Sequence, residues 1–201
     1  MKVIEVSASK GGVGTSTVAV SLAVALSQAN PQGVLLVDTS THADTWAIAG
    51  LSVPHSELHT TLGEHELAFR RATVEGLADL APFHNREFVV IDAGTSPRSE
   101  YFGQTPFRVS VVTNSYLSLR AETFRKTKPD AVVCVHNSEA VLNTGDVKNV
   151  LSAPLVHYFA VDNSVARAID AGLYAGARTH LFAEWTSDFL RDHGLATPVT
   201  A

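Results

Sequence analysis

The sequence is poor in features that would mark several classes of protein. It has one cysteine, Cys134, which excludes a disulfide framework and a metal site built from several cysteines. No stretch approaches the roughly eighteen uninterrupted apolar residues of a membrane-spanning helix. Charged residues make up 17% of the chain and the net charge is −5, a balance that does not attract nucleic acid or anionic lipid overall. We therefore expect a protein of a reducing compartment, the cytoplasm, without stable membrane insertion.

The length and composition indicate a single globular unit. The chain has 201 residues, of which 45% are hydrophobic, enough to bury one sizeable core. No internal repeat, low-complexity segment or shift in composition marks a boundary between domains. We expect one domain over residues 1–201, with a frayed tail over 196–201.

Short apolar runs alternate with segments that suit helices. The runs are rich in Val, Ile and Leu and are continuous rather than alternating, which is typical of parallel strands buried on both faces. This order predicts an α/β fold, doubly wound, with a mostly parallel sheet of about seven strands and helices on both faces. Strands are expected at 3–7, 34–38, 77–81, 88–92, 109–113, 131–135 and 155–159, and helices at 16–28, 63–71, 98–104, 117–126, 146–151, 164–171 and 181–192.

A glycine-rich stretch, Ser7–Thr17, separates the first expected strand from the first expected helix. Glycines let backbone amides converge on an anion, and the start of the helix adds the positive end of its dipole. The pattern is close to the phosphate-binding loop G-x-x-x-x-G-K-[ST], with Ser9 at the first glycine and Thr15 at the lysine. Ser16 then occupies the position of the hydroxyl that binds Mg²⁺. The alternative is a turn that serves only tight packing of strand against helix.

Two of the expected strands end in an aspartate, Asp38 and Asp92. A carboxylate that closes an apolar strand beside a phosphate-binding loop is the Walker B arrangement, in which it orients Mg²⁺ and its waters. The carboxyl ends of parallel strands lie at one edge of the sheet, where the glycine-rich loop also falls. Ser16, Asp38 and Asp92 are therefore the predicted Mg²⁺ shell. The alternative for each carboxylate is the cap of a following turn.

The motifs together resemble those of the ParA/MinD family of deviant Walker P-loop ATPases. The matching stretches are Ser7–Gly14, Gly33–Asp38 and Val89–Asp92, with further similarity at 111–120 and 154–172. The resemblance covers most of the chain and is weakest over 47–83. It implies a P-loop NTPase fold that binds ATP or ADP with Mg²⁺.

The resemblance also implies a homodimer and the residues that hold the nucleotide. Lys10 matches the family's signature lysine, which reaches the phosphates bound by the partner chain. Asn137 falls where the family places an asparagine near the base, although a plain turn residue at a strand end is an equal alternative. The nucleotide-binding residues implied are Lys10, Gly11, Gly12, Val13, Gly14, Thr15, Ser16, Thr17 and Asn137.

The chain departs from the family pattern at two positions that matter for hydrolysis. Members that hydrolyse ATP have a lysine where Thr15 stands and a water-orienting aspartate where Ser40 stands. Both groups are main supports of phosphoryl transfer. Asp44 is a nearby carboxylate, but nothing in the sequence requires it to replace the missing one. We expect an atypical member with weak or absent ATP hydrolysis, and we assign no catalytic residue.

Four basic residues are candidates for contact with DNA. Partition ATPases of the family touch DNA, and a contact of this kind would be nonspecific and steeply dependent on salt. The alternative is a solvated helix face, which the acidic balance of the chain favours. The expected helix at 181–192 has an apolar stripe and a mainly acidic polar side, which indicates core packing rather than membrane binding. The candidate DNA contacts are Arg120, Arg125, Lys126 and Arg167.

The resemblance implies a partition or positioning protein, for DNA or plasmid segregation or for intracellular positioning, with a ParB-like adaptor as its partner. The first alternative is a non-hydrolysing scaffold that localises a pilus or secretion-type assembly. The second is an ATP-dependent metabolic synthetase on the same fold. The missing lysine and aspartate weigh against the synthetase, and so does the lack of residues for a substrate domain.

Overall fold

The structure is a computed structural model that describes residues 1–30, 33–40, 44–51, 57–62, 65–72, 86–136, 138–153 and 156–195. The strands are β1 (Lys2–Ser7), β2 (Val34–Asp38), β3 (Glu57–Leu62), β4 (His65–Arg71), β5 (Phe88–Gly94), β6 (Phe107–Thr113), β7 (Ala131–His136) and β8 (Val156–Ala160). The helices are α1 (Thr15–Ala29), α2 (Asp44–Ile48), α3 (Tyr116–Thr123), α4 (Thr144–Leu151), α5 (Asn163–Asp170) and α6 (Ala183–Asp192), with a 3-10 turn at Thr179–Leu181.

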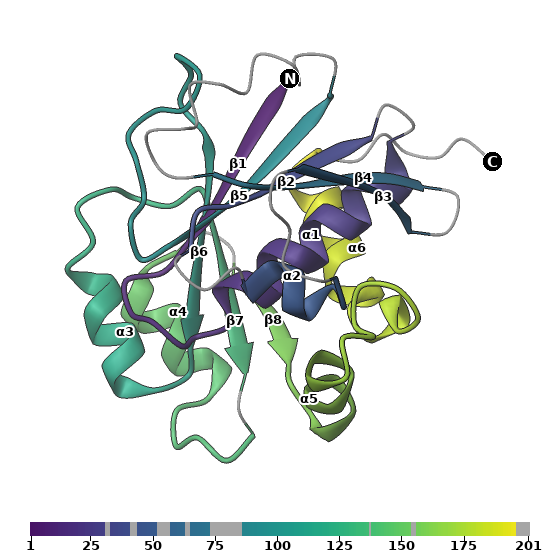
Figure 1. The fold of residues 1–201 in the computed structure, drawn as a ribbon. Helices are drawn as coiled ribbons and strands as arrows, with labels where there is room; N and C mark the ends of the chain where they lie inside the picture. The colour runs from purple at the N-terminus through teal and green to yellow at the C-terminus, as the bar shows by residue number, and fades with distance from the viewer. Residues whose placement is uncertain are drawn as a thin grey trace.

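One sheet of eight strands runs through the middle of the molecule, with helices on both faces (Figure 1). Its order is β3-β4-β2-β5-β1-β6-β7-β8, and neighbouring strands are parallel except for the antiparallel pair β3 and β4 at one edge. The predicted doubly wound α/β fold is confirmed. The sheet exceeds the expected seven strands because the β3–β4 hairpin extends it.

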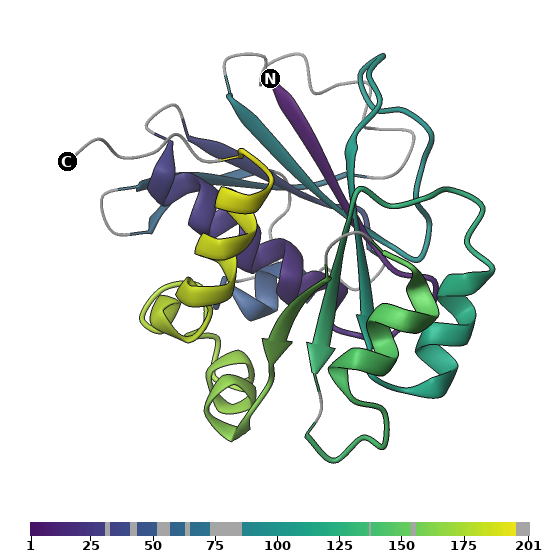
Figure 2. The same ribbon diagram turned by 180° about the vertical axis from the view of Figure 1, so that it is seen from behind.

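Helix α1 lies against one face of the sheet and is buried on almost every side. All residues from Val18 to Val24 are buried, which is the pattern of a helix enclosed between layers rather than one with a solvent face. It packs on β1, β2, β4 and β5, with α2 and α6 alongside (Figure 2). This enclosure fixes the N-terminus of α1 at the carboxyl edge of the sheet, directly after the glycine-rich loop.

The other face carries α3 and α4 over β6 to β8, and an irregular segment over β1, β2 and β5. The helix predicted at 98–104 is wrong. In its place the Arg98 amide donates to the Glu5 carboxylate at 2.8 Å, Tyr101 is buried in the sheet's second core cluster, and Phe102 has a φ of 53°. The segment is therefore a packed loop, held by the Arg98 amide on Glu5 of β1 and by the mutual backbone hydrogen bonds of Tyr101 and Gln104.

A second predicted helix, at 63–71, is also wrong, because the chain there forms β4. Leu67, Ala68 and Phe69 are buried in succession, which suits a strand covered on both faces, and they pair with β2 from Val34 to Leu36. Leucine and alanine favour helices in isolation, but pairing with a neighbouring strand decided the structure.

Several expectations fall outside the described residues, including the strand predicted at 77–81 and the tail at 196–201. Strand β3 and helix α2 were not predicted. Where the structure describes the chain, it contains no helix that combines the length and the apolar character needed to cross a membrane.

Candidate nucleotide-binding site

A cleft of about 680 Å³ opens at the carboxyl ends of β1, β2 and β5. Its walls come from the loops that follow these three strands and from the end of α5. The sequence predicted that the glycine-rich loop and the ends of β2 and β5 would lie together at this edge of the sheet. Ile169 and Asp170 of α5 were not predicted, because nothing local in the sequence links them to the loops. The lining residues are 11–12, 14–17, 39–40, 44, 47–48, 93–96 and 169–170.

The glycine-rich loop depends on two glycines for its shape. Gly12 and Gly14 have φ values of 74° and 92°, a region that side chains with a Cβ rarely adopt. A Cβ on Gly14 would also lie 3.2 Å from the Cγ2 atom of Val135. Gly14 caps α1, and its carbonyl accepts the Val18 amide at 3.0 Å. Thr15, in the position of the usual lysine, is buried at the first residue of that helix.

Asp92 is fully buried at the end of β5 and carries an unsatisfied oxygen. Its Oδ1 accepts the Gly94 amide at 3.1 Å, whereas its Oδ2 has no hydrogen-bond partner among the described residues. Burial raises the pKa of Asp92 to about 6, and the negative charge of Asp38 adds to this rise. The Ser16 hydroxyl lies near enough to lower the pKa in part, although it does not form a hydrogen bond with Oδ2.

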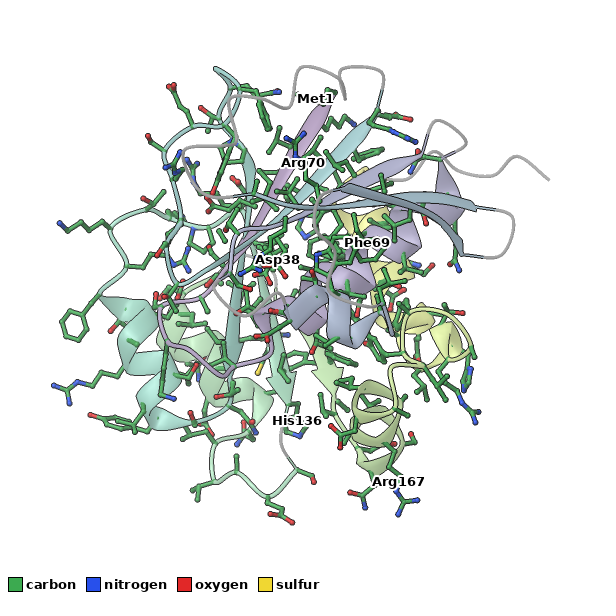
Figure 3. The ribbon with its side chains drawn as sticks, in the orientation of Figure 1. Met1, Asp38, Phe69, Arg70, His136 and Arg167 are labelled. Carbon is green, nitrogen blue, oxygen red and sulfur yellow. The ribbon has the colours of Figure 1, made fainter. Side chains whose placement is uncertain are left out.

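Asp38 stands next to Asp92 across the sheet, and both oxygens of its carboxylate accept hydrogen bonds. Its Oδ1 accepts the Ser40 amide at 2.7 Å, and its Oδ2 accepts the Thr45 amide at 3.1 Å and the Thr45 hydroxyl at 2.6 Å. Asp38, labelled in Figure 3, therefore holds Ser40 and the first turn of α2, which line the cleft.

The donor set fits a magnesium nucleotide. The glycine loop offers amides at the start of a buried helix, which suits phosphate groups. The free Oδ2 of Asp92 and the Ser16 hydroxyl are hard oxygen ligands of the kind that Mg²⁺ binds, directly or through its waters. A cation there would also relieve the cost of burying the charge of Asp92.

Comparison with known proteins places this geometry in a known fold. The model of a family described as an AAA domain matches residues 1–93. MinD from Pyrococcus horikoshii in complex with Mg-ADP superposes with a TM-score of 0.73 at 16% identity, over 98% of this chain and 99% of that one. The chain has the fold of the ParA/MinD ATPases. The P-loop NTPase fold that the resemblance implied is confirmed.

Other structures with the ParA/MinD fold agree. A Cyanothece McdA–ATP complex has a TM-score of 0.71 at 13% identity and covers 100% of this chain and 99% of its own. A ParA family ATPase from Chlorobium tepidum has a TM-score of 0.66 at 17% identity, over 94% and 96% of the two chains. The search of curated proteins found no match.

Within the ParA/MinD fold, the two departures seen in the sequence both concern the cleft. Ser40 lines it, and the Ser40 hydroxyl is buried without a partner among the described residues. Asp44 also lines it, with an exposed side chain. Asn137, which the resemblance placed near the base, lies outside the described residues.

Lys10 is exposed at the start of the loop and makes no hydrogen bond or ion pair with the residues that the structure describes. The residue before it is tethered, because the Ser9 hydroxyl donates to the Glu122 carboxylate of α3 at 2.7 Å. The loop is thus anchored on one side of Lys10 while the lysine itself extends into solvent.

The structure separates the candidate DNA contacts. Arg120 and Lys126 are exposed on α3 and just after it, whereas Arg167 is exposed on α5, on the other side of the molecule in both views (Figures 1 and 2). The Arg125 side chain is only 6% exposed and pairs with Glu122 at 2.8 Å. Arg125 has a structural position here rather than the surface position that the sequence predicted.

Proposed function

We propose that this protein is a nucleotide-dependent partition or positioning protein that binds ATP or ADP with Mg²⁺ and dimerises around it. The observation that carries the proposal is the free, buried Oδ2 of Asp92 beside Ser16 and the glycine loop. Solved structures of the same fold include a MinD complex with Mg-ADP and an McdA complex with ATP. These support a nucleotide in the equivalent cleft.

In the proposed complex the residues of the cleft divide the work. The amides of the loop from Gly11 to Thr17 would hold the phosphates, and Ser16 and Asp92 would hold the Mg²⁺ shell. The ion, when bound, neutralises charge on the phosphates. Asp38 keeps the wall of the cleft in position through Ser40 and Thr45.

The exposed position of Lys10 is the observation that favours a nucleotide-dependent dimer. An exposed lysine without an ionic partner among the described residues has its charge free for phosphates bound by a second copy. The phosphates would then bridge two chains that otherwise lack this contact. A homodimer of this kind can be switched by nucleotide, and an adaptor protein can read the switch.

Hydrolysis in this site is expected to be weak. Thr15 supplies no positive charge, and Ser40 supplies no carboxylate to orient water. Each loss costs on the order of a hundredfold in rate. The exposed Asp44 is the nearest carboxylate to Ser40 in sequence that lines the cleft, and the Ser40 hydroxyl has no hydrogen-bond partner among the described residues.

Calorimetry with ADP and with ATP, each with Mg²⁺, tests the proposal. Wild-type protein should bind both, and Ser16→Ala should weaken binding about tenfold or more because a ligand of the metal shell is lost. Lys10→Ala should keep the affinity of the monomer for ADP and lose dimerisation with ATP. Lys148→Ala, an exposed lysine on α4 away from the cleft, is the matched control and should behave as wild type.

Two results would count against the proposal. Absence of binding to either nucleotide would remove it altogether. A stable dimer that forms without nucleotide would favour instead the non-hydrolysing scaffold, in which the positions of Thr15 and Ser40 have lost their charge because no phosphate chemistry is needed.

A further inference from the structure

We propose that a groove between α3 and α4 binds an acidic, partly apolar segment of a partner protein. The groove has a volume of about 390 Å³ and lies beside the start of β7. It shares no lining residue with the nucleotide cleft, and the inference stands whether or not the cleft binds nucleotide. Its lining consists of residues 122–123, 125–129, 132 and 150–153.

The rim of the groove is basic although the chain as a whole is acidic. Lys126 and Lys128 are exposed on the segment between α3 and β7. The one carboxylate in the lining, Glu122, is buried and already paired with Arg125 at 2.8 Å. The accessible charge of the groove is therefore positive, which is complementary to an acidic ligand.

Arg125 supplies a specific feature that a basic surface alone would lack. Its side chain is 6% exposed, its Nε pairs with Glu122, and its Nη1 donates to the Ser7 hydroxyl at 3.1 Å. Its Nη2 is buried and has no hydrogen-bond partner among the described residues. A carboxylate is the acceptor that best matches a guanidinium donor, and a buried donor without a partner is costly enough to favour a ligand that satisfies it.

The apolar part of the lining favours a protein segment over nucleic acid. Val132 and Leu151 lie along the groove, and Val150 is 47% exposed at its edge. Phe124, which directly precedes the lining residues of the loop, is 73% exposed. A nucleic-acid backbone has no apolar groups to cover such side chains, whereas a peptide that mixes acidic and aliphatic residues covers them and meets the lysines as well.

The same arginine connects the groove to the start of the glycine loop. Arg125 and Glu122 together hold Ser7 and Ser9, and Ser9 precedes Lys10. A carboxylate in the groove that draws on the Arg125 guanidinium would therefore alter the anchor of Lys10. The groove is thus placed to let a partner influence the loop without entering the cleft.

The test is a titration of ¹⁵N-labelled protein with a short synthetic peptide of alternating glutamate and leucine. The Arg125 Nε–H signal and the amides of Val150–Ala153 should shift, and the amides of the cleft loop at Gly94–Ser96 should not. The double variant Lys126→Glu, Lys128→Glu should bind the peptide about tenfold more weakly or worse. Lys148→Glu, the same charge change on an exposed α4 residue outside the groove, should bind it as wild type does.

Further controls distinguish binding in the groove from nonspecific attraction between charges. The same peptide with glutamine in place of glutamate should bind at least tenfold more weakly, because Nη2 and the lysines lose their carboxylates. An equal loss in Lys148→Glu, or no loss in the double variant, would overturn the proposal. So would shifts of the groove signals with short duplex DNA and not with the peptide.

Discussion

At the scale of one residue, the buried charge of Asp92 suits a bound cation but lowers the stability of the unliganded protein. Its carboxyl group has an ordinary pKa of 3.8, and burial with the charge of Asp38 raises the pKa to about 6 in the folded protein. Between these two pH values the folded state holds the proton more tightly than the unfolded state. The contribution of this group to the free energy of unfolding therefore falls as the pH rises, and the charged carboxylate destabilises the unliganded protein at pH 7.

Replacing Asp92 with asparagine should therefore stabilise the unliganded protein at pH 7. The gain expected from the rise in pKa is about 2 to 3 kcal/mol, since one unit corresponds to about 1.4 kcal/mol. The gain should shrink as the pH falls and vanish below about pH 3, where the wild-type carboxyl is protonated in both states. Urea unfolding at the two pH values measures this, and an equal gain at both would show that the charge is not its cause.

A pair of histidines, His157 and His193, should make the free energy of unfolding depend on pH in the opposite direction. The Nε2 atoms of His157 and His193 lie 3.2 Å apart between β8 and the end of α6. Burial lowers the pKa of both histidines, and the charge of His193 lowers the pKa of His157 further. Nearby carboxylates oppose this in part: Asp192 raises both pKa values, Asp188 raises that of His157, and Asp130 raises that of His193. The rings of Phe107 and Phe189 pack around them.

The unfolded protein therefore binds more protons here once the pH falls below the ordinary histidine value of about 6.5. The free energy of unfolding should decrease as the pH falls from 7 toward 5 at this site, and His157→Gln should have a flatter dependence. The comparison of variant with wild type cancels the contribution of Asp92, which both proteins share. A variant with the same slope as wild type would show that the pair does not titrate in this way.

At the same scale, the sequence anticipated some residues of the site and not others. Asp92, Ser16 and the glycines follow from motifs, because a strand end and a loop spacing fix their positions. The structural role of Asp38 and the burial of Arg125 depend on partners at distant positions, Thr45 and Glu122 among them. A pattern in one short segment cannot supply such partners.

At the scale of elements, the cleft depends on a close contact between α2 and α5. Gly50 and Gly172 follow these helices with φ values of 71° and 65°. A Cβ on Gly50 would lie 2.0 Å from the carbonyl oxygen of Gly172, and one on Gly172 would lie 2.7 Å from the Cα of Gly50. Both helices contribute walls to the cleft, so this contact sets its width.

Gly172→Ala should therefore both destabilise the protein and weaken nucleotide binding. The strained φ and the backbone clash predict a loss of about 2 to 4 kcal/mol in the free energy of unfolding. Gly176→Ala is the matched control, because a Cβ there meets no atom within 4 Å and its φ is not positive. Thermal unfolding of both variants measures the effect. Equal stability of the two would mean that α2 and α5 do not need the close contact.

The elements themselves were predictable where an apolar run decides the structure alone. β2 and α1 have nearly the bounds expected, since one is a continuous apolar strand and the other follows a glycine loop. β4 was mistaken for a helix because its residues favour helices locally and become a strand only by pairing with β2. The segment at 98–104 was also mistaken for a helix, since the hydrogen bond from the Arg98 amide to Glu5 cannot be predicted from the segment's own residues.

At the scale of the whole molecule, the fold brings a complete phosphate cradle and an incomplete catalytic set into one cleft. The glycine loop, Ser16 and Asp92 are arranged to bind, while Thr15 and Ser40 remove charges that hydrolysis needs. In the proposed function the exposed Lys10 supplies the contact for a second chain, and the groove beside α3 lies apart from the cleft. In the proposed function the protein binds ATP and dimerises with little turnover.

Light scattering during size-exclusion chromatography, with analysis of the bound nucleotide, tests this claim most directly. The chain has a mass of 21.4 kDa. With ATP and Mg²⁺ we expect a species of twice that mass from which intact ATP is recovered after prolonged incubation, and a monomer when nucleotide is absent. A monomer under all conditions with no nucleotide bound, or rapid conversion of the bound ATP to ADP, would contradict the account.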